Sequence, residues 1–254
     1  MKEIEIQRYD FNTSGMVVIP GFYGVDTVEK MKKASQSSDL QSLFIKNNPE
    51  LFMDFMSDER IINICRDFIG NWFRFDHELC VTQDKEAKAY LHGGQFGSQG
   101  TCTYVSTNDG CSWNGQLTVG LALTKQDEST GGFSYIPGSH HQTLQGKHGV
   151  QLTEIWEYFL NNNKATTLDL YPGDLYIFSE SVVHGQTRWN MEEDRRTLYI
   201  KYVPGYMAWQ SYEDVTKGYL QYATKPIHEL LLRPPSVRSG TFDNPTWRKS
   251  TRKR

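Results

Sequence analysis

Residues 172–196, PGDLYIFSESVVHGQTRWNMEEDRR, constrain the fold of this chain more than any other stretch. A Pro-Gly turn opens a short apolar run, 175–178, which is typical of a buried strand. The run leads to a single histidine, His184, and the stretch ends with Arg195 and Arg196. Neutral imidazole binds iron, zinc or copper, and the planar guanidinium of arginine pairs with both oxygens of a carboxylate. Taken alone, however, His184 is more typical of a structural histidine.

A second histidine, in Leu91-His92-Gly93-Gly94, stands upstream in a matching setting, and GGFSYIPGSH lies between the two. Three motifs occur in this order: HGG, GGFSYIPGSH, and PGDLYIF…H-x10-R followed by TLYIKYVPGY. With them the sequence resembles the phytanoyl-CoA dioxygenase family of iron(II)/2-oxoglutarate oxygenases. The opening SGMVVIPGF also looks like the start of that family, so the match spans roughly residues 14–209. The resemblance implies a mainly β fold with flanking helices, a double-stranded β-helix (a cupin-like jelly roll) with an N-terminal helical layer.

The resemblance also implies roles for individual residues. His92 and His184 would hold iron(II), and Arg195 would bind the far carboxylate of 2-oxoglutarate, whose keto-acid end would chelate the metal. Such an enzyme uses O2 to oxidise an unactivated C–H bond of a small-molecule substrate and releases succinate and CO2. Arg195 is preferred to Arg196 because neighbouring residues on a strand point to opposite faces, which leaves Arg196 on the surface.

One position departs from the family pattern. Family members usually have His-x-Asp or His-x-Glu at the first ligand pair, which completes a triad of two histidines and one carboxylate. Here the residue two positions after His92 is Gly94, which has no side chain to bind a metal. The open coordination site could hold chloride or bromide, as in 2-oxoglutarate halogenases, or water, or a carboxylate from elsewhere. Asp76, Glu78 and Asp109 are candidate donors, although each also fits as a surface carboxylate or a loop cap.

Three functions are therefore in view: an oxygenase that hydroxylates a small metabolite, a halogenase, and a catalytically inactive binding module on the same scaffold. Retention of His92, His184 and Arg195 favours an enzyme. A zinc hydrolase is a weaker interpretation, because two histidines without a third protein ligand make a poor zinc site. His140 and His141, in PGSHH, would shape the pocket. The substrate is not identified, because family members act on acyl-CoAs, amino acids, nucleosides and alkaloid-like metabolites.

Length and composition predict one large domain, residues 1–235, followed by a mobile, polar and basic tail, residues 236–254. The chain has 254 residues with 27 basic and 30 acidic side chains, so neither nucleic acid nor a membrane is an expected partner. The sequence shows no secretory segment and no run of about 18 apolar residues, which favours a cytoplasmic protein. The cysteines lack C-x-x-C spacing and are expected to be reduced thiols. The oligomeric state stays open.

Hydrophobic periodicity predicts helices early in the chain and short strands later. Helices are expected at 26–35, 40–45, 49–56, 58–68 and 153–161. Strands are expected at 16–19, 72–75, 79–81, 89–91, 117–123, 134–136, 167–170, 175–178 and 198–202. Residues 95–112 are too polar for the core and are interpreted as a long functional loop.

Overall fold

The computed structural model describes residues 2–35, 46–93, 105–108, 111–141, 152–162 and 164–236. The helices are α1 (Lys2–Ser14), α2 (Val25–Ala34), α4 (Pro49–Met56), α5 (Glu59–Ile69), α6 (Leu152–Asn161) and α7 (Pro226–Leu231), with the 3-10 helices η1 (Ser139–His141) and η2 (Thr216–Tyr222). The strands are β1 (Met16–Ile19), β2 (Phe73–Gln83), β3 (Tyr90–Gly93), β4 (Val105–Asn108), β5 (Cys111–Asn114), β6 (Leu117–Ala122), β7 (Phe133–Tyr135), β8 (Thr166–Thr167), β9 (Leu175–Ser179), β10 (Val183–Gln186) and β11 (Arg195–Pro204).

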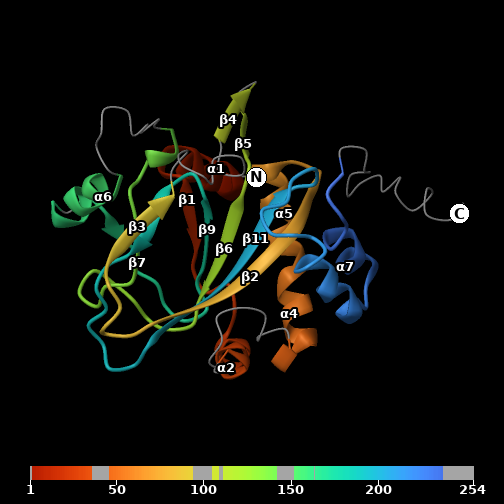
Figure 1. Ribbon diagram of the computed structural model, residues 1–254, viewed down its shortest axis with the longest axis horizontal. Helices are drawn as coiled ribbons and strands as arrows, with labels where there is room; N and C mark the ends of the chain where they lie inside the picture. Colours follow the sequence, from red (N-terminus) through yellow and green to blue (C-terminus); the bar gives the residue numbers. More distant parts are fainter. Residues whose placement is uncertain are drawn as a thin grey trace, which may run out of the picture.

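Two antiparallel sheets form the centre of the molecule. The larger has the strand order β1-β9-β6-β11-β2, and the smaller has the order β3-β10-β7-β8. Figure 1 shows β3 and β7 on the left and the strands of the larger sheet beside them. Phe133 from the smaller sheet packs in one apolar cluster with Met16, Tyr176 and Phe178 from the larger. Facing antiparallel sheets with an apolar filling are typical of a jelly roll, so the predicted fold class is confirmed.

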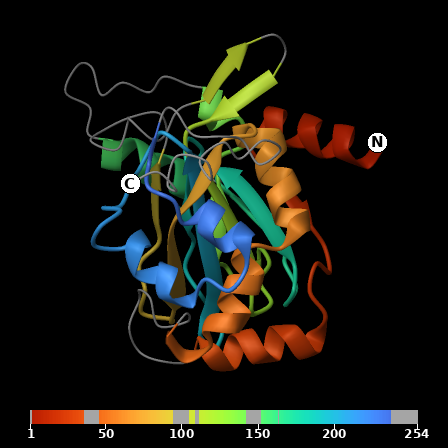
Figure 2. The ribbon, with the colours of Figure 1, turned by 90° about the vertical axis from the view of Figure 1, so that its right-hand side faces the viewer.

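Helices cover the other face of the larger sheet, as Figure 2 shows for α4, α5 and α7. Helix α5 begins after Asp58, whose side chain caps the first turn by accepting a hydrogen bond from the backbone N–H of Arg60 at 3.0 Å. The amphipathic pattern of α5 explains why it packs on the sheet. Its apolar stripe, which includes Ile61 and Cys65, joins a core cluster with residues of the sheet such as Val119. The predicted N-terminal helical layer is therefore confirmed.

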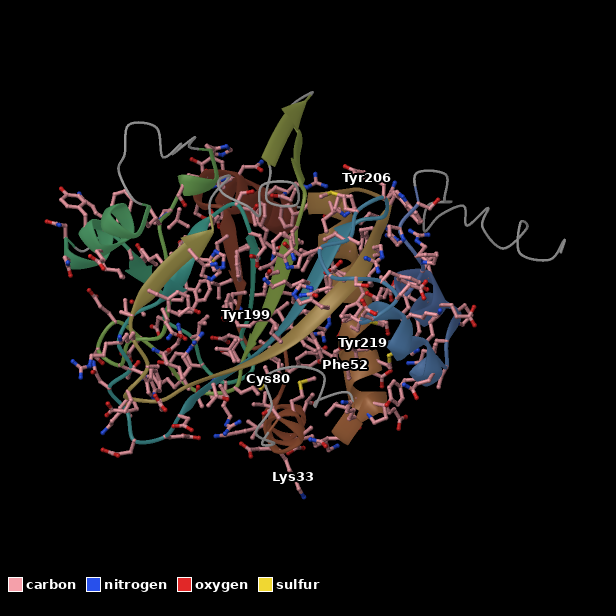
Figure 3. All side chains as sticks on the ribbon, in the orientation of Figure 1. Lys33, Phe52, Cys80, Tyr199, Tyr206 and Tyr219 are labelled. Atoms are coloured by element: carbon pink, nitrogen blue, oxygen red, sulfur yellow. The ribbon has the colours of Figure 1, made fainter. Side chains whose placement is uncertain are left out.

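The long strand β2 pairs with β11 and sorts its side chains between the two faces of the larger sheet. Leu79 lies opposite Tyr199 in the ladder, and Cys80 lies opposite Leu198. Leu79 and Tyr199 face the smaller sheet, whereas Cys80 and Leu198 pack toward the helices. Figure 3 shows this division, with Tyr199 to the left of β2 and β11 and Phe52 and Tyr219 to their right, beside the helices.

The structure differs from the predicted elements in several places. Strand β10, which carries His184, and helix α7 were not predicted, and the strand expected at 167–170 is β8, Thr166–Thr167. Helix α1 was not predicted, and β2 is one continuous strand where two strands, 72–75 and 79–81, were expected. The range 95–112 was predicted to be a loop, but it contains β4 and the start of β5, which pair as a hairpin. The predicted helix 40–45 and residues 237–254 of the predicted tail lie outside the described residues.

The structure tests two further predictions only in part: the absence of a membrane-spanning segment and the reduced state of the cysteines. Within the described residues, no helix combines the length and the apolar character that crossing a membrane would need. Cys65 and Cys80 are free thiols. Burial raises the pKa of both thiols, which disfavours the reactive thiolate form.

Candidate active site

Strands β3 and β10 bring His92 and His184 together. The antiparallel register places the two residues directly opposite each other, with their ring centroids 4.3 Å apart. Gly93 permits this approach: it has a φ of +88°, and a Cβ there would lie 2.5 Å from the Val182 carbonyl oxygen and 3.0 Å from Nδ1 of His184. A side chain at this position would push β3 away from β10. The first glycine of the HGG motif is therefore a packing requirement of the histidine pair.

Both imidazoles are held in the neutral form that binds metals. Nδ1 of His184 lies 2.7 Å from the Val182 carbonyl oxygen. Because a carbonyl only accepts, Nδ1 carries the proton and Nε2 presents its lone pair. Burial lowers the pKa of His184, and burial together with the neighbouring His184 lowers the pKa of His92 to about 3. The donor set thus fits a metal of intermediate softness such as iron(II).

Arg195, on β11, is only 2% exposed. Its Nε donates to Gln126 Oε1 at 2.8 Å, its Nη1 to Gln83 Oε1 at 3.3 Å and its Nη2 to the Tyr199 hydroxyl at 3.2 Å. Burial alone would lower the pKa of Arg195, but the phenols of Tyr199 and Tyr176 raise it above its ordinary value. These hydrogen-bond partners are neutral groups around a buried cation, and a carboxylate is the ligand that such a cation favours.

The two histidines and Arg195 line one cavity of about 110 Å³. Its apolar wall includes Leu79, Phe133 and Phe178, and such a wall restricts water around a metal. The neighbouring Arg196 turns the other way and donates to the Ser35 carbonyl oxygen at 3.0 Å. Arg196 is half-buried and not a freely exposed surface residue.

Asp76 and Glu78, two of the carboxylates considered as a third ligand, do not reach the histidines. Asp76 pairs with Arg74 at 3.2 Å and with Nδ1 of His77 at 2.6 Å. Glu78 accepts from the Tyr219 hydroxyl at 3.3 Å, on the helical side of the larger sheet. Neither residue lines the cavity that contains the histidines. Asp76 and Glu78 are even-numbered residues of β2, and the side chains of these residues face away from the cavity. Neither carboxylate is therefore suitable as a metal ligand.

His140 and His141, which were expected to shape the pocket, do not line the cavity that contains the histidine pair. In His140 and His141, Nε2 lies 3.2 Å and 2.8 Å from the Asn12 carbonyl oxygen, so these side chains pack against the end of α1. Gly94 and Asp109 lie outside the described residues.

Sequence reasoning did not single out Glu180, which follows β9 and is 4% exposed. It is the one carboxylate among the described residues that line the cavity, and its Oε2 lies 3.9 Å from Nε2 of His184. Among the described residues, no three His, Cys, Asp or Glu side chains form a ready-made metal cluster. The signal in the sequence was the E-x-x-x-H spacing between Glu180 and His184, directly after a buried strand.

Comparisons with known proteins agree with this geometry. Residues 95–197 match the model of the phytanoyl-CoA dioxygenase (PhyH) family, a range that includes His184 and Arg195. The resemblance inferred from the sequence is confirmed over this range of residues. Among curated proteins, no sequence matches the chain.

Solved structures share the fold at low sequence identity. HygX from Streptomyces hygroscopicus, with nickel, 2-oxoglutarate and hygromycin B bound, has a TM-score of 0.70 and 22% identity over 81% of this chain and 89% of its own. The epimerase SnoN from nogalamycin biosynthesis, in complex with Fe3+, alpha ketoglutarate and nogalamycin RO, has a TM-score of 0.60 and 14% identity over 96% of this chain and 94% of its own. The carbocyclase SnoK from the same biosynthesis has a TM-score of 0.59 and 16% identity over 87% and 90%. These neighbours share the fold of this chain, and two of them are named as an epimerase and a carbocyclase.

Proposed function

We propose that this protein is an iron(II)/2-oxoglutarate-dependent dioxygenase that hydroxylates an aliphatic C–H bond of a small metabolite. The observation that carries the proposal is the pairing of neutral His92 and His184 across β3 and β10, in the same cavity as the buried cation of Arg195. HygX with iron bound, and SnoN with Fe3+ and alpha ketoglutarate, support the choice of cofactors.

Each residue of the cavity has a part in this reaction. His92 and His184 would hold the metal through imidazole nitrogens, and Nδ1–H of His184 would stay on the Val182 carbonyl to fix the ring. Arg195 would bind the far carboxylate of 2-oxoglutarate with its guanidinium. Phe133 and Phe178 would keep water away from the reacting atoms.

Iron(II) and 2-oxoglutarate, when bound, would supply the oxidation, in which one oxygen atom of O2 would enter succinate, the other would form the substrate hydroxyl, and CO2 would leave. The protein contributes position, because the substrate C–H bond must face the metal when the oxidant forms. HygX holds hygromycin B and SnoN holds nogalamycin RO, so we propose a small-molecule substrate here as well.

Gly94 favours a second candidate, a halogenase of the same family. With no side chain at the usual carboxylate position, chloride or bromide could bind the metal beside His92. The substrate radical would then take the halide instead of the hydroxyl group. In a halogenase, Gly94→Asp should abolish halogenation, and continued halogenation by that variant would exclude this candidate.

The test is the anaerobic visible spectrum of the purified protein with iron(II) and 2-oxoglutarate, before and after chloride or bromide is added. Chelation of 2-oxoglutarate to iron gives a charge-transfer band, and the proposal expects that band without a shift on addition of halide. A band that shifts when halide is added would favour the halogenase over the oxygenase. Absence of any band would indicate that the protein is a catalytically inactive binding module.

A further inference from the structure

Glu180 uses its two carboxylate oxygens differently. Oε1 accepts hydrogen bonds from the Thr118 hydroxyl and from Lys201 Nζ, the latter at 2.7 Å. Oε2 is the oxygen directed at the histidine pair, 3.9 Å from Nε2 of His184. Lys201 and Thr118 thus orient the carboxylate by one oxygen and leave the other toward the cavity.

Oε2 and Nε2 are close enough for one metal ion to bind both once the two atoms adjust their positions. Ligands bound at about 2.1 Å lie about 3 Å apart when adjacent on the metal and about 4.2 Å apart when opposite. The separation of 3.9 Å falls between these limits. Nε2 of His184 is also the ring nitrogen that presents a lone pair, because Nδ1–H is bonded to the Val182 carbonyl.

Burial of a carboxylate is unfavourable unless it is paired, and Glu180 is paired with a cation that keeps it ionised. A metal ligand must be deprotonated, so this environment prepares Glu180 for coordination.

From this arrangement we infer that Glu180 is the third protein ligand of the metal and supplies the carboxylate that Gly94 cannot. The inference rests on the proposed function, since it assigns a ligand to the metal held by His92 and His184. The carboxylate would come from the residues after β9, four positions before the second histidine, where the family pattern takes it from two positions after the first. With this ligand in place, no coordination site beside Gly94 is reserved for a halide.

The experiment measures metal affinity, not turnover. The apo form of the full chain is titrated anaerobically with iron(II), and separately with cobalt(II), whose visible spectrum reports the number and type of its ligands. Glu180→Gln keeps the shape of the side chain and removes its charge, and we expect it to weaken binding of both metals at least about tenfold. The cobalt spectrum should change at the same time.

Glu78→Gln is the matched control. Glu78 is 6% exposed, close to the 4% of Glu180, but it lies on the helical face of the larger sheet, and its variant should bind cobalt(II) like the parent. Gly94→Asp, introduced into Glu180→Gln, returns a carboxylate to the family position and should restore metal affinity. Gly94→Asp alone should add little affinity if Glu180 already binds the metal, and an equal gain in both backgrounds would point to a purely structural role of Glu180.

The outcomes separate this inference from the proposed function. If the parent shows the iron(II)/2-oxoglutarate band and Glu180→Gln binds metal as tightly as the parent, Glu180 is not a ligand and the dioxygenase proposal stands. A parent that binds no iron(II) overturns both. Should Glu180→Gln fail to fold because Lys201 is left without a counter-charge, Glu180→Gln/Lys201→Met removes both charges and is expected to show the same loss of metal affinity.

Discussion

The Tyr176 hydroxyl lies 2.5 Å from the Tyr199 hydroxyl, to which it donates, and Nη2 of Arg195 donates to the same Tyr199 oxygen at 3.2 Å. Tyr199 therefore accepts twice in this arrangement, and its own O–H proton remains available for a group in the cavity that it lines. The proposed cosubstrate would place a carboxylate beside Arg195, where that proton can be donated.

Removal of the Tyr199 hydroxyl should therefore weaken 2-oxoglutarate binding. Tyr199→Phe loses one hydrogen bond to a charged group, which is worth about 1.5–3 kcal/mol, so we expect the Kd of 2-oxoglutarate to rise on the order of 10–100-fold. The measurement is titration of the charge-transfer band. Tyr202→Phe is the control, because the Tyr202 hydroxyl donates to the Met56 carbonyl oxygen on the helical side and its loss should affect stability alone.

Replacement of Arg195 should have a larger effect on the same titration. Arg195→Gln removes the buried cation, and we expect the Kd of 2-oxoglutarate to rise at least about 100-fold while the affinity for iron(II) stays the same. Arg196→Gln tests the choice between the neighbours, since Arg196 contacts Ser35 on the helical face. Weaker 2-oxoglutarate binding in Arg196→Gln than in Arg195→Gln would reverse the assignment.

Gly120, on β6, makes room for the ring of Tyr176. A Cβ at this position would lie 2.5 Å from Cζ of Tyr176, and the ring is too deeply buried to swing out. We expect Gly120→Ala to destabilise the fold by about 1–3 kcal/mol and to weaken 2-oxoglutarate binding, because the displaced Tyr176 loses its contact with Tyr199. Urea unfolding and the charge-transfer titration measure the two effects. Gly218→Ala, where a Cβ meets nothing within 4 Å, should change neither.

The pH dependence of stability should contain a contribution from His228 in α7. Its Nδ1 accepts from the backbone N–H groups of Thr224 and Lys225 at 3.2 and 3.3 Å, and its Nε2 lies 3.1 Å from the Ser57 hydroxyl. Burial, assisted by the charge of Lys225 and opposed by Asp54, lowers the pKa of His228 below 6.5.

Because the unfolded chain binds this proton more readily than the folded one, stability should fall as the pH drops below about 6.5. His228→Gln cannot take up the proton, so its free energy of unfolding should depend less on pH between 6.5 and 5 than that of the parent. Urea unfolding across this range tests the expectation, and identical slopes for the two proteins would contradict it.

The sequence was most informative where local pattern and chemistry coincide. The apolar run at 175–178 forms most of β9, His92 lies on β3 where a strand was expected to lead into it, and Arg195 begins β11, because strands and turns carry local signals. His184, in contrast, lies within β10, which was not predicted. The prediction divided β2 into two strands because the residues around Asp76 are polar. In the structure those polar groups are paired within the fold, and the strand continues through them. Tertiary pairing decided that strand, and no local pattern records it.

Helix α1 and Glu180 escaped prediction for related reasons. α1 is polar, and it is held in part by the stacking of Phe11 on Phe68 of α5, with ring centroids 4.0 Å apart. In the sequence, nothing distinguishes Glu180 from an ordinary residue that follows a strand. Its relation to Lys201, and to Thr118 on another strand, exists only once three strands are assembled.

The order of the larger sheet has a consequence for the way the protein folds. β2 pairs with β11 over residues 73–83 and 195–204, and β1 pairs with β9 over 16–19 and 175–178, so these pairings join distant parts of the chain. Such topologies fold slowly, in milliseconds to seconds, because large loops must close before the contacts that stabilise them form. Since Arg195 lies on β11 and the histidines on β3 and β10, the cavity is completed only at the end of this process. Iron and 2-oxoglutarate would therefore bind a chain that has already folded, and they would stabilise it without guiding its folding.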